Sequence, residues 1–174
     1  MIRFAFCLCL SLGGFSSTLD FPPSATIPVD LNFAQSGYYA VKFDAGKFVA
    51  AFHQAEKQAG PGVKPLSRGE SHLTLLTPPE FQRLSESERQ KLLVELQGLD
   101  WSKPQIKLLC LGRGEVPLNG KPESAYFVVA EAPGIQKIRE KFGLKVFYPH
   151  VTVGFTRRDL HFEDGVIKDR STCI

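Results

Sequence analysis

Residues 71–76 read Ser-His-Leu-Thr-Leu-Leu and residues 149–154 read Pro-His-Val-Thr-Val-Gly, so the pattern His, apolar, Thr, apolar occurs twice. Both segments are rich in residues that favour β-strands. Because side chains alternate between the two faces of a strand, each His shares a face with the Thr that follows two positions later. The apolar residues between them point to the opposite face, which should be buried. The sequence therefore predicts two strands, each with an imidazole and a hydroxyl on one face.

The four polar side chains of these segments, His72, Thr74, His150 and Thr152, are suited to acid–base chemistry on a phosphate. An imidazole with a pKa near its usual value of about 6.5 gives and takes protons at neutral pH. A threonine hydroxyl donates hydrogen bonds to phosphate oxygens. Strand propensity alone explains a single His-x-Thr, but two copies in matched contexts favour one shared catalytic site. Either histidine fits either role, base or acid.

The two motifs, their separation and the order of predicted elements from about Tyr38 to about Asp169 resemble the 2H phosphoesterase superfamily. Within it, the chain is similar to the Swiss army knife, RNA-repair-like group. The resemblance implies an α+β, two-lobed fold with mainly antiparallel sheets, flanking helices and a central cleft. It also implies a metal-independent phosphodiesterase without a cofactor. The substrates would be 2′,3′-cyclic phosphates, 2′-5′ linkages, RNA 3′ ends or a small cyclic phosphate of nucleotide-sugar metabolism.

Three further residues are candidate substrate contacts. Tyr148 precedes His150 by two positions and should share its face, where its ring could stack on a base. Tyr126 lies on another predicted strand. Arg157 follows the second motif closely enough to reach an outer phosphate oxygen. We expect these residues to bind RNA ends or a nucleotide-like phosphodiester, with the protein acting as a monomer that does not span a membrane.

Hydrophobic periodicity predicts elements in the order β-α-β-α-β-β-α-β. Strands and helices that mix without a strict βαβ repeat favour α+β with a largely antiparallel sheet, although the spacing alone fits a ferredoxin-like fold equally well. Residues 112–122 are expected to form a turn-rich connection that contains an Asn-Gly turn. The expected strands are 38–43, 71–76, 106–111, 125–130 and 146–155, and the expected helices are 45–59, one that starts at the capping box 85–88, and 133–141.

The length of 174 residues suits one domain, 37–174. Because the net charge is only +3, we expect local contacts with anionic groups and no broad basic surface for nucleic acid. Residues 1–17 contain Arg3, a short apolar run and small residues, which is the layout of a signal peptide. The alternative is a wrongly chosen start on a cytosolic protein. Residues 18–36 read as an extended leader. The protein is secreted if the first segment is cleaved and cytoplasmic otherwise.

The remaining histidines and cysteines are expected to have structural or surface roles. His53 and His161 are predicted to be solvent-exposed. Cys110 lies in an apolar strand and is expected to be buried and unreactive, and it could form a disulfide with Cys173 in an oxidising compartment. Two other functions stay open. A zinc hydrolase lacks a third ligand near either motif, and a non-catalytic RNA- or nucleotide-binding module gives no reason for two His-x-Thr pairs.

Overall fold

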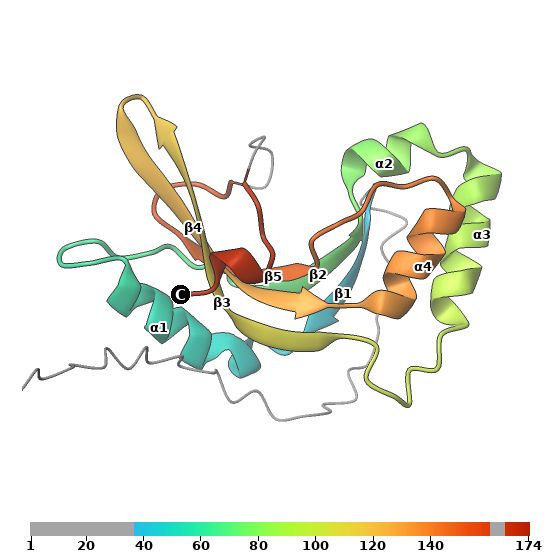
Figure 1. The fold of residues 1–174 in the computed structure, drawn as a ribbon, viewed down its shortest axis with the longest axis horizontal. Helices are drawn as coiled ribbons and strands as arrows, with labels where there is room; N and C mark the ends of the chain where they lie inside the picture. The colour runs from blue at the N-terminus through green and yellow to red at the C-terminus, as the bar shows by residue number, and fades with distance from the viewer. Residues whose placement is uncertain (1–36, 161–165) are drawn as a thin grey trace, which may run out of the picture.

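Five strands form one antiparallel sheet in the order β1-β2-β5-β4-β3 in the computed structural model (Figure 1), which describes residues 37–160 and 166–174. The predicted signal peptide, the leader and His161 lie outside these residues. The α+β class is confirmed, and the predicted elements occur in the predicted order with one additional short α-helix, α2 (Pro78–Arg83). The strands are β1 (Tyr39–Phe43), β2 (Ser71–Leu76), β3 (Lys107–Leu118), β4 (Lys121–Glu131) and β5 (His150–Phe155).

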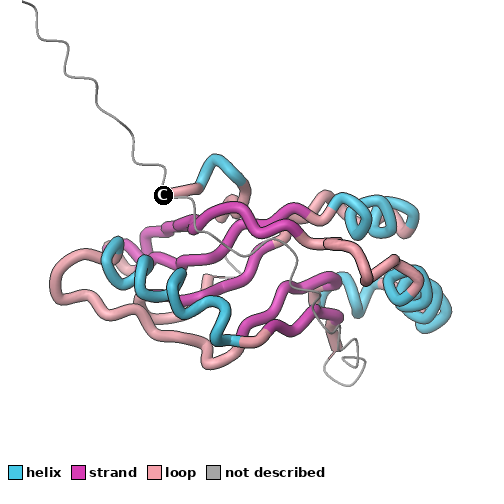
Figure 2. Tube along the Cα trace, turned by 90° about the horizontal axis from the view of Figure 1, so that it is seen from below, coloured by secondary structure: helices cyan, strands magenta, loops and turns pink. Residues whose placement is uncertain are grey.

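Helix α1 packs against β3, β4 and β5, whereas the other α-helices gather near one end of the sheet. Figure 1 shows α1 on one side and α2, α3 and α4 gathered on the other, and in Figure 2 α1 lies across the strands while the other helices extend beyond one end of the sheet. Within the described residues, no helix is both long enough and apolar enough to cross a membrane. The α-helices are α1 (Val49–Gln58), α2 (Pro78–Arg83), α3 (Glu86–Gln97) and α4 (Pro133–Lys141), and short 3₁₀ helices cover Ala45–Phe48 and Arg170–Thr172.

The sheet consists of two parts that meet at a narrow seam. The pair β1–β2 forms one part, and β3, β4 and β5 form the other. Leu73 of β2 pairs with Val151 of β5 in antiparallel register, and both side chains are completely buried. The two lobes implied by the family resemblance are therefore joined within one continuous sheet, and each contributes one His-x-Thr strand to the junction.

Capping residues fix the start of two helices that lead away from the first motif. The Glu88 carboxylate accepts a hydrogen bond of 2.8 Å from the backbone N–H of Ser85, which completes the predicted capping box of α3. Glu80 similarly accepts from the backbone N–H of Thr77 at 3.0 Å and begins α2, a short helix that periodicity did not predict. Gly98 follows α3 as its C-cap.

The prediction that residues 112–122 form an irregular connection is wrong. Strand β3 continues to Leu118, and β4 starts at Lys121, so only Asn119 and Gly120 form the turn. Their positive φ values of 51° and 73° fit the predicted Asn-Gly hairpin turn. The second motif strand is also shorter than predicted, because β5 begins at His150 rather than at residue 146.

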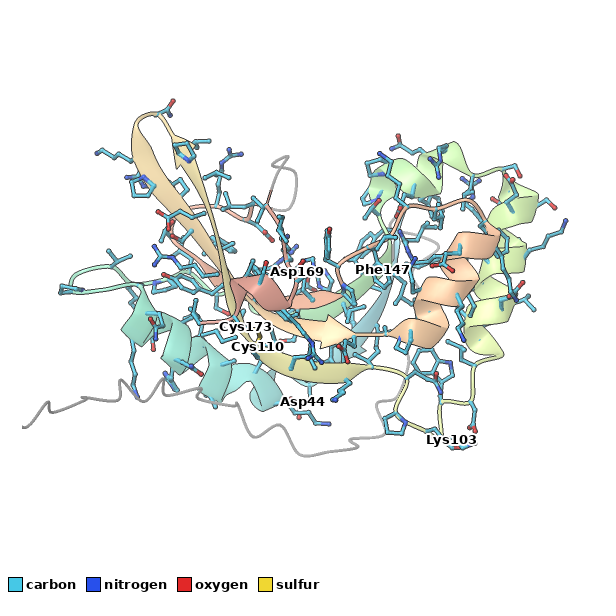
Figure 3. All side chains as sticks on the ribbon, viewed as in Figure 1. Asp44, Lys103, Cys110, Phe147, Asp169 and Cys173 are labelled. Carbon is cyan, nitrogen blue, oxygen red and sulfur yellow. A yellow bond between two sulfur atoms is a disulfide. The ribbon has the colours of Figure 1, made fainter. Side chains whose placement is uncertain are left out.

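A disulfide between Cys110 and Cys173 fastens the C-terminal arm, residues 166–174, to β3. Figure 3 shows the two cysteines next to each other. The backbone N–H of Ile174 also donates to the carbonyl of Leu111 at 2.9 Å. The disulfide that the sequence allowed is therefore present. Cys110 was expected to be buried and is instead half-buried and disulfide-bonded.

Two glycines of β3 make room for the C-terminal arm. A Cβ atom at Gly112 would lie 2.9 Å from Oγ1 of Thr172 and 2.6 Å from the ring of Phe127. A Cβ atom at Gly114 would collide with the side chain of Val166. The Gly-x-Gly sequence in this strand therefore permits close packing of the arm on the sheet.

Candidate active site

A cavity of about 400 Å³ opens at the seam of the sheet, and all four polar residues of the two motifs line it: His72, Thr74, His150 and Thr152. The sequence predicted that these side chains face one site, and the fold brings them together. Six more residues complete the lining: Tyr38, Arg68, Thr77, Pro78, Pro79 and Lys168.

The strand register explains how the four side chains meet. Because β2 and β5 are antiparallel and Leu73 pairs with Val151, position 72 is level with position 152, and position 74 with position 150. Each histidine therefore stands beside the threonine of the other motif. Alternation along the strands sends these polar side chains to the face opposite the buried Leu73 and Val151.

The tautomer of His150 follows from its two hydrogen bonds. Its Nδ1 lies 2.7 Å from the carbonyl oxygen of Tyr148, and since a carbonyl only accepts, Nδ1 carries the hydrogen. The Nε2 atom is then an acceptor, and the ammonium group of Lys168 lies 3.2 Å from it. Burial, reinforced by the charge of Lys168, lowers the pKa of His150 to about 3. His150 is therefore a neutral imidazole at physiological pH.

His72 has a different electrostatic environment. Its side chain is only 10% exposed, and its Nδ1 lies 3.3 Å from a carboxylate oxygen of Glu70, within ion-pair distance but without the geometry of a hydrogen bond. Burial lowers the pKa of His72, and the nearby charge of Arg68 lowers it further. The carboxylates of Glu70 and Asp159 act in the opposite direction. Anionic neighbours thus favour a proton on His72, whereas Lys168 disfavours one on His150.

The cavity is also lined by two cationic side chains, which the sequence motifs did not predict. Arg68 lies in the loop before β2 and forms an ion pair with Asp159, with 2.6 Å between Nη1 and Oδ2. Lys168 comes from the C-terminal arm and is 7% exposed. Burial lowers its pKa, and Asp159 opposes this effect. The position of Arg68 just before the first motif was a signal that could have been used, but no local pattern marks Lys168.

The three additional residues predicted to contact substrate are not among the residues that line the cavity. Tyr126 is a correction: it is completely buried in the core and cannot reach a ligand in this conformation. Arg157 is 61% exposed and pairs with Glu123 at 3.2 Å. Tyr148 is 45% exposed. It precedes the first residue of β5, so strand alternation does not place it beside His150.

The other polar residues that the sequence highlights do not form a metal site within the part of the chain that the structure describes. His53 is exposed, as predicted, and its Nδ1 lies 2.8 Å from the carboxylate of Glu56. Among residues 37–160 and 166–174, His, Cys, Asp and Glu do not form a group of three or more that could hold a metal ion.

A comparison with protein families matches residues 37–161 to the Swiss Army Knife, 2H phosphoesterase domain. The match covers well over half of the chain and includes both His-x-Thr motifs. It ends before the described part of the C-terminal arm, and therefore before Lys168. No curated protein and no solved structure matches the chain.

Proposed function

The chain belongs to the Swiss Army Knife group of 2H phosphoesterase domains and is a phosphodiesterase-type enzyme, and on this premise we propose how it acts. We propose that the cavity hydrolyses cyclic phosphate, 2′-5′ or RNA-end phosphodiester bonds by two-histidine acid–base catalysis that needs no metal ion. The observation that carries this proposal is the presence of both histidines and both threonines in the lining of one cavity.

His150 is assigned the role of base. Its Nδ1–H donates to the Tyr148 carbonyl, which holds the ring in place and leaves the lone pair on Nε2. A neutral imidazole is the form that a base requires, and the low pKa of His150 keeps the ring neutral. In hydrolysis, Nε2 takes a proton from a water molecule as the water oxygen forms a bond to phosphorus.

His72 is assigned the role of acid. The bond between phosphorus and the leaving ribose oxygen breaks as His72 gives that oxygen a proton. The carboxylates of Glu70 and Asp159 favour the protonated ring. Burial and Arg68 lower the pKa of His72 in the free protein, and the negative charge of a bound phosphodiester opposes this effect in the complex.

Thr74 and Thr152 are assigned to the non-bridging phosphate oxygens. Each threonine lies level with the histidine of the other strand, so a phosphate between the imidazoles would lie within reach of both hydroxyls. Arg68 adds a positive charge to the same cavity. Charge on the non-bridging oxygens is therefore stabilised from both strands.

The size of the cavity favours a small phosphodiester or the end of a longer chain. A volume of about 400 Å³ is in the range of small-molecule sites. The ring of Tyr38 lies in the lining, with its centroid 6.0 Å from that of His72, and offers an aromatic surface for a base or a sugar. Both motifs belong to the same chain, and we expect the monomer to be active.

Purified protein assayed with 2′,3′-cyclic nucleotides, 2′-5′ dinucleotides and a 3′-tailed RNA tests the proposal. We expect turnover of at least one substrate in the presence of EDTA, and loss of turnover in His72→Ala and His150→Ala proteins. Loss of activity on chelation would support a zinc hydrolase instead. Tight RNA binding without turnover would support a non-catalytic module.

A further inference from the structure

Lys168 occupies an unusual place for a lysine. It is 7% exposed, its ammonium group is 3.2 Å from Nε2 of His150, and it lines the cavity between the motifs. The ring of Phe127 is near both groups: its centroid is 5.8 Å from the ammonium nitrogen and 5.7 Å from the centroid of the imidazole. Burial of a lysine carries a large desolvation cost, which contacts with neighbouring groups must offset. The neighbours of Lys168 in the cavity therefore indicate its role.

The C-terminal arm places this ammonium group and holds it there. Lys168 is five positions before Cys173, which the disulfide ties to β3. Arg170 pairs with Glu131 at the end of β4, with 2.6 Å between Nη2 and Oε1. The glycines of β3 let the arm lie directly against the sheet. The position of Lys168 is thus set by several contacts on both sides of it.

The ammonium group of Lys168 donates a hydrogen bond to the nitrogen of His150 that the proposed reaction needs. Nε2 is the lone-pair nitrogen of His150, and it accepts a hydrogen bond from the ammonium. A base whose lone pair is engaged in this way cannot accept a proton from water. An anionic phosphate oxygen is a stronger partner for an ammonium group than a neutral imidazole is.

We propose that Lys168 is the phosphate-binding cation of this site and that it changes partner when substrate binds, moving its hydrogen bond from His150 to a phosphate oxygen. The substrate thereby frees the base that activates the attacking water molecule. This inference rests on the proposed function and deepens it, because it couples binding of the anion to activation of His150. It also assigns a substrate contact to the arm, beyond the residues matched to the family.

The ordinary alternative is that Lys168 is a structural residue that only fills space beside His150. A Lys168→Met protein separates the two roles, since methionine keeps an unbranched side chain and removes the charge. Lys168→Arg keeps the charge. Lys121→Met, at the exposed end of the β3–β4 hairpin, is the matched control.

Two measurements on the full chain test the proposal without an activity assay. Calorimetry with inorganic phosphate should show a dissociation constant roughly ten- to a hundredfold higher for Lys168→Met, as expected for loss of one hydrogen bond to a charged group, and close to wild type for the other two variants. NMR titration of the imidazoles, with His150 identified through His150→Gln, should show a higher pKa for His150 in Lys168→Met, because removal of a neighbouring cation favours the imidazolium.

A folded Lys168→Met protein with wild-type phosphate affinity and an unchanged His150 titration would overturn the proposal. If that variant fails to fold, the wild-type protein decides: saturating phosphate must shift the His150 ring nitrogen signals, and unshifted signals reject the exchange of partners. Absence of turnover on every substrate would overturn the proposed function instead. That result leaves both measurements on Lys168 interpretable.

Discussion

Leu73 and Val151 face each other across the seam between β2 and β5, and each lies between the histidine and the threonine of its own motif. This apolar pair is buried on one side of the sheet, while the four polar side chains line the cavity. The pairing of two apolar residues therefore sets the relative position of two imidazoles. Packing in the core and the geometry proposed for catalysis depend on the same contact.

Replacement of either motif histidine by alanine should reduce kcat/KM by a factor on the order of 10²–10⁴, since each removes one proton-transfer group. The double variant should lose less than the product of the two factors, because both groups act in the same step. Exposed His53→Ala is the control and should retain the wild-type rate. Near-normal turnover in His72→Ala and His150→Ala would show that the site is elsewhere.

Thr74→Val and Thr152→Val should have milder effects. Each variant keeps the shape of the side chain and loses one hydrogen bond to a charged oxygen, which corresponds to about 1.5–3 kcal/mol of transition-state stabilisation. Steady-state kinetics should show the loss mainly in kcat. Thr74→Ser and Thr152→Ser retain the hydroxyl and should restore most of the rate, an outcome that a purely structural role does not predict.

The dependence of kcat/KM on pH should have its maximum on the acidic side of neutrality. His150 must be neutral, and it is so above its pKa of about 3. His72 must be protonated, and its pKa is lowered from 6.5, so the protonated fraction decreases as the pH rises through that lowered value. Rates measured from roughly pH 4 to pH 9 should decline through neutral pH, and a steady rise there would contradict the assigned roles.

Stability should also depend on pH through His150. The folded pKa of about 3 lies below the unfolded value of 6.5, so between these values the unfolded chain binds a proton that the folded chain does not. The free energy of unfolding should therefore decrease as the pH falls below about 6.5, with a slope of at most about 1.4 kcal/mol per pH unit from this residue. Denaturant titrations of His150→Gln should show a weaker dependence, whereas His53→Gln should behave as wild type.

Reduction of the disulfide should lower both stability and activity. The bond joins residues 63 positions apart, for which the chain-entropy relation gives a contribution of roughly 4 kcal/mol. Release of the arm should also free Lys168 from its place beside His150. Thermal melting and turnover with and without reductant would measure the two effects. The reductant should change nothing further in a Cys173→Ala protein.

The residues of the two motifs could be predicted because strand alternation is a local property. His72 and Thr74 share a face whatever the rest of the chain does, and the same holds for His150 and Thr152. Which strands become neighbours is a property of the whole fold, so the pairing of Leu73 with Val151 is not readable from either segment. Lys168 was missed for a similar reason: its position depends on a disulfide and on close packing against β3.

The errors have equally definite physical causes. Alternation along a strand shows which residues share a face, but it does not show which face other elements cover. Tyr126 lies on the inner strand β4, and its side chain is in the core. The rule applies only within a strand, and Tyr148 precedes β5. The glycines and the proline in residues 112–118 suggested a turn, yet this stretch belongs to β3, and its two glycines make room for the C-terminal arm.

The disulfide closes a covalent loop that contains the second motif and excludes the first. A proteolytic cut at the exposed hairpin tip, between Asn119 and Gly120, falls inside this loop. The two fragments would each carry one motif histidine and would remain linked by the sulfur–sulfur bond and by the β3–β4 ladder. A nicked molecule would thus persist as a two-chain enzyme in oxidising surroundings. Under reducing conditions, its two halves would be free to separate.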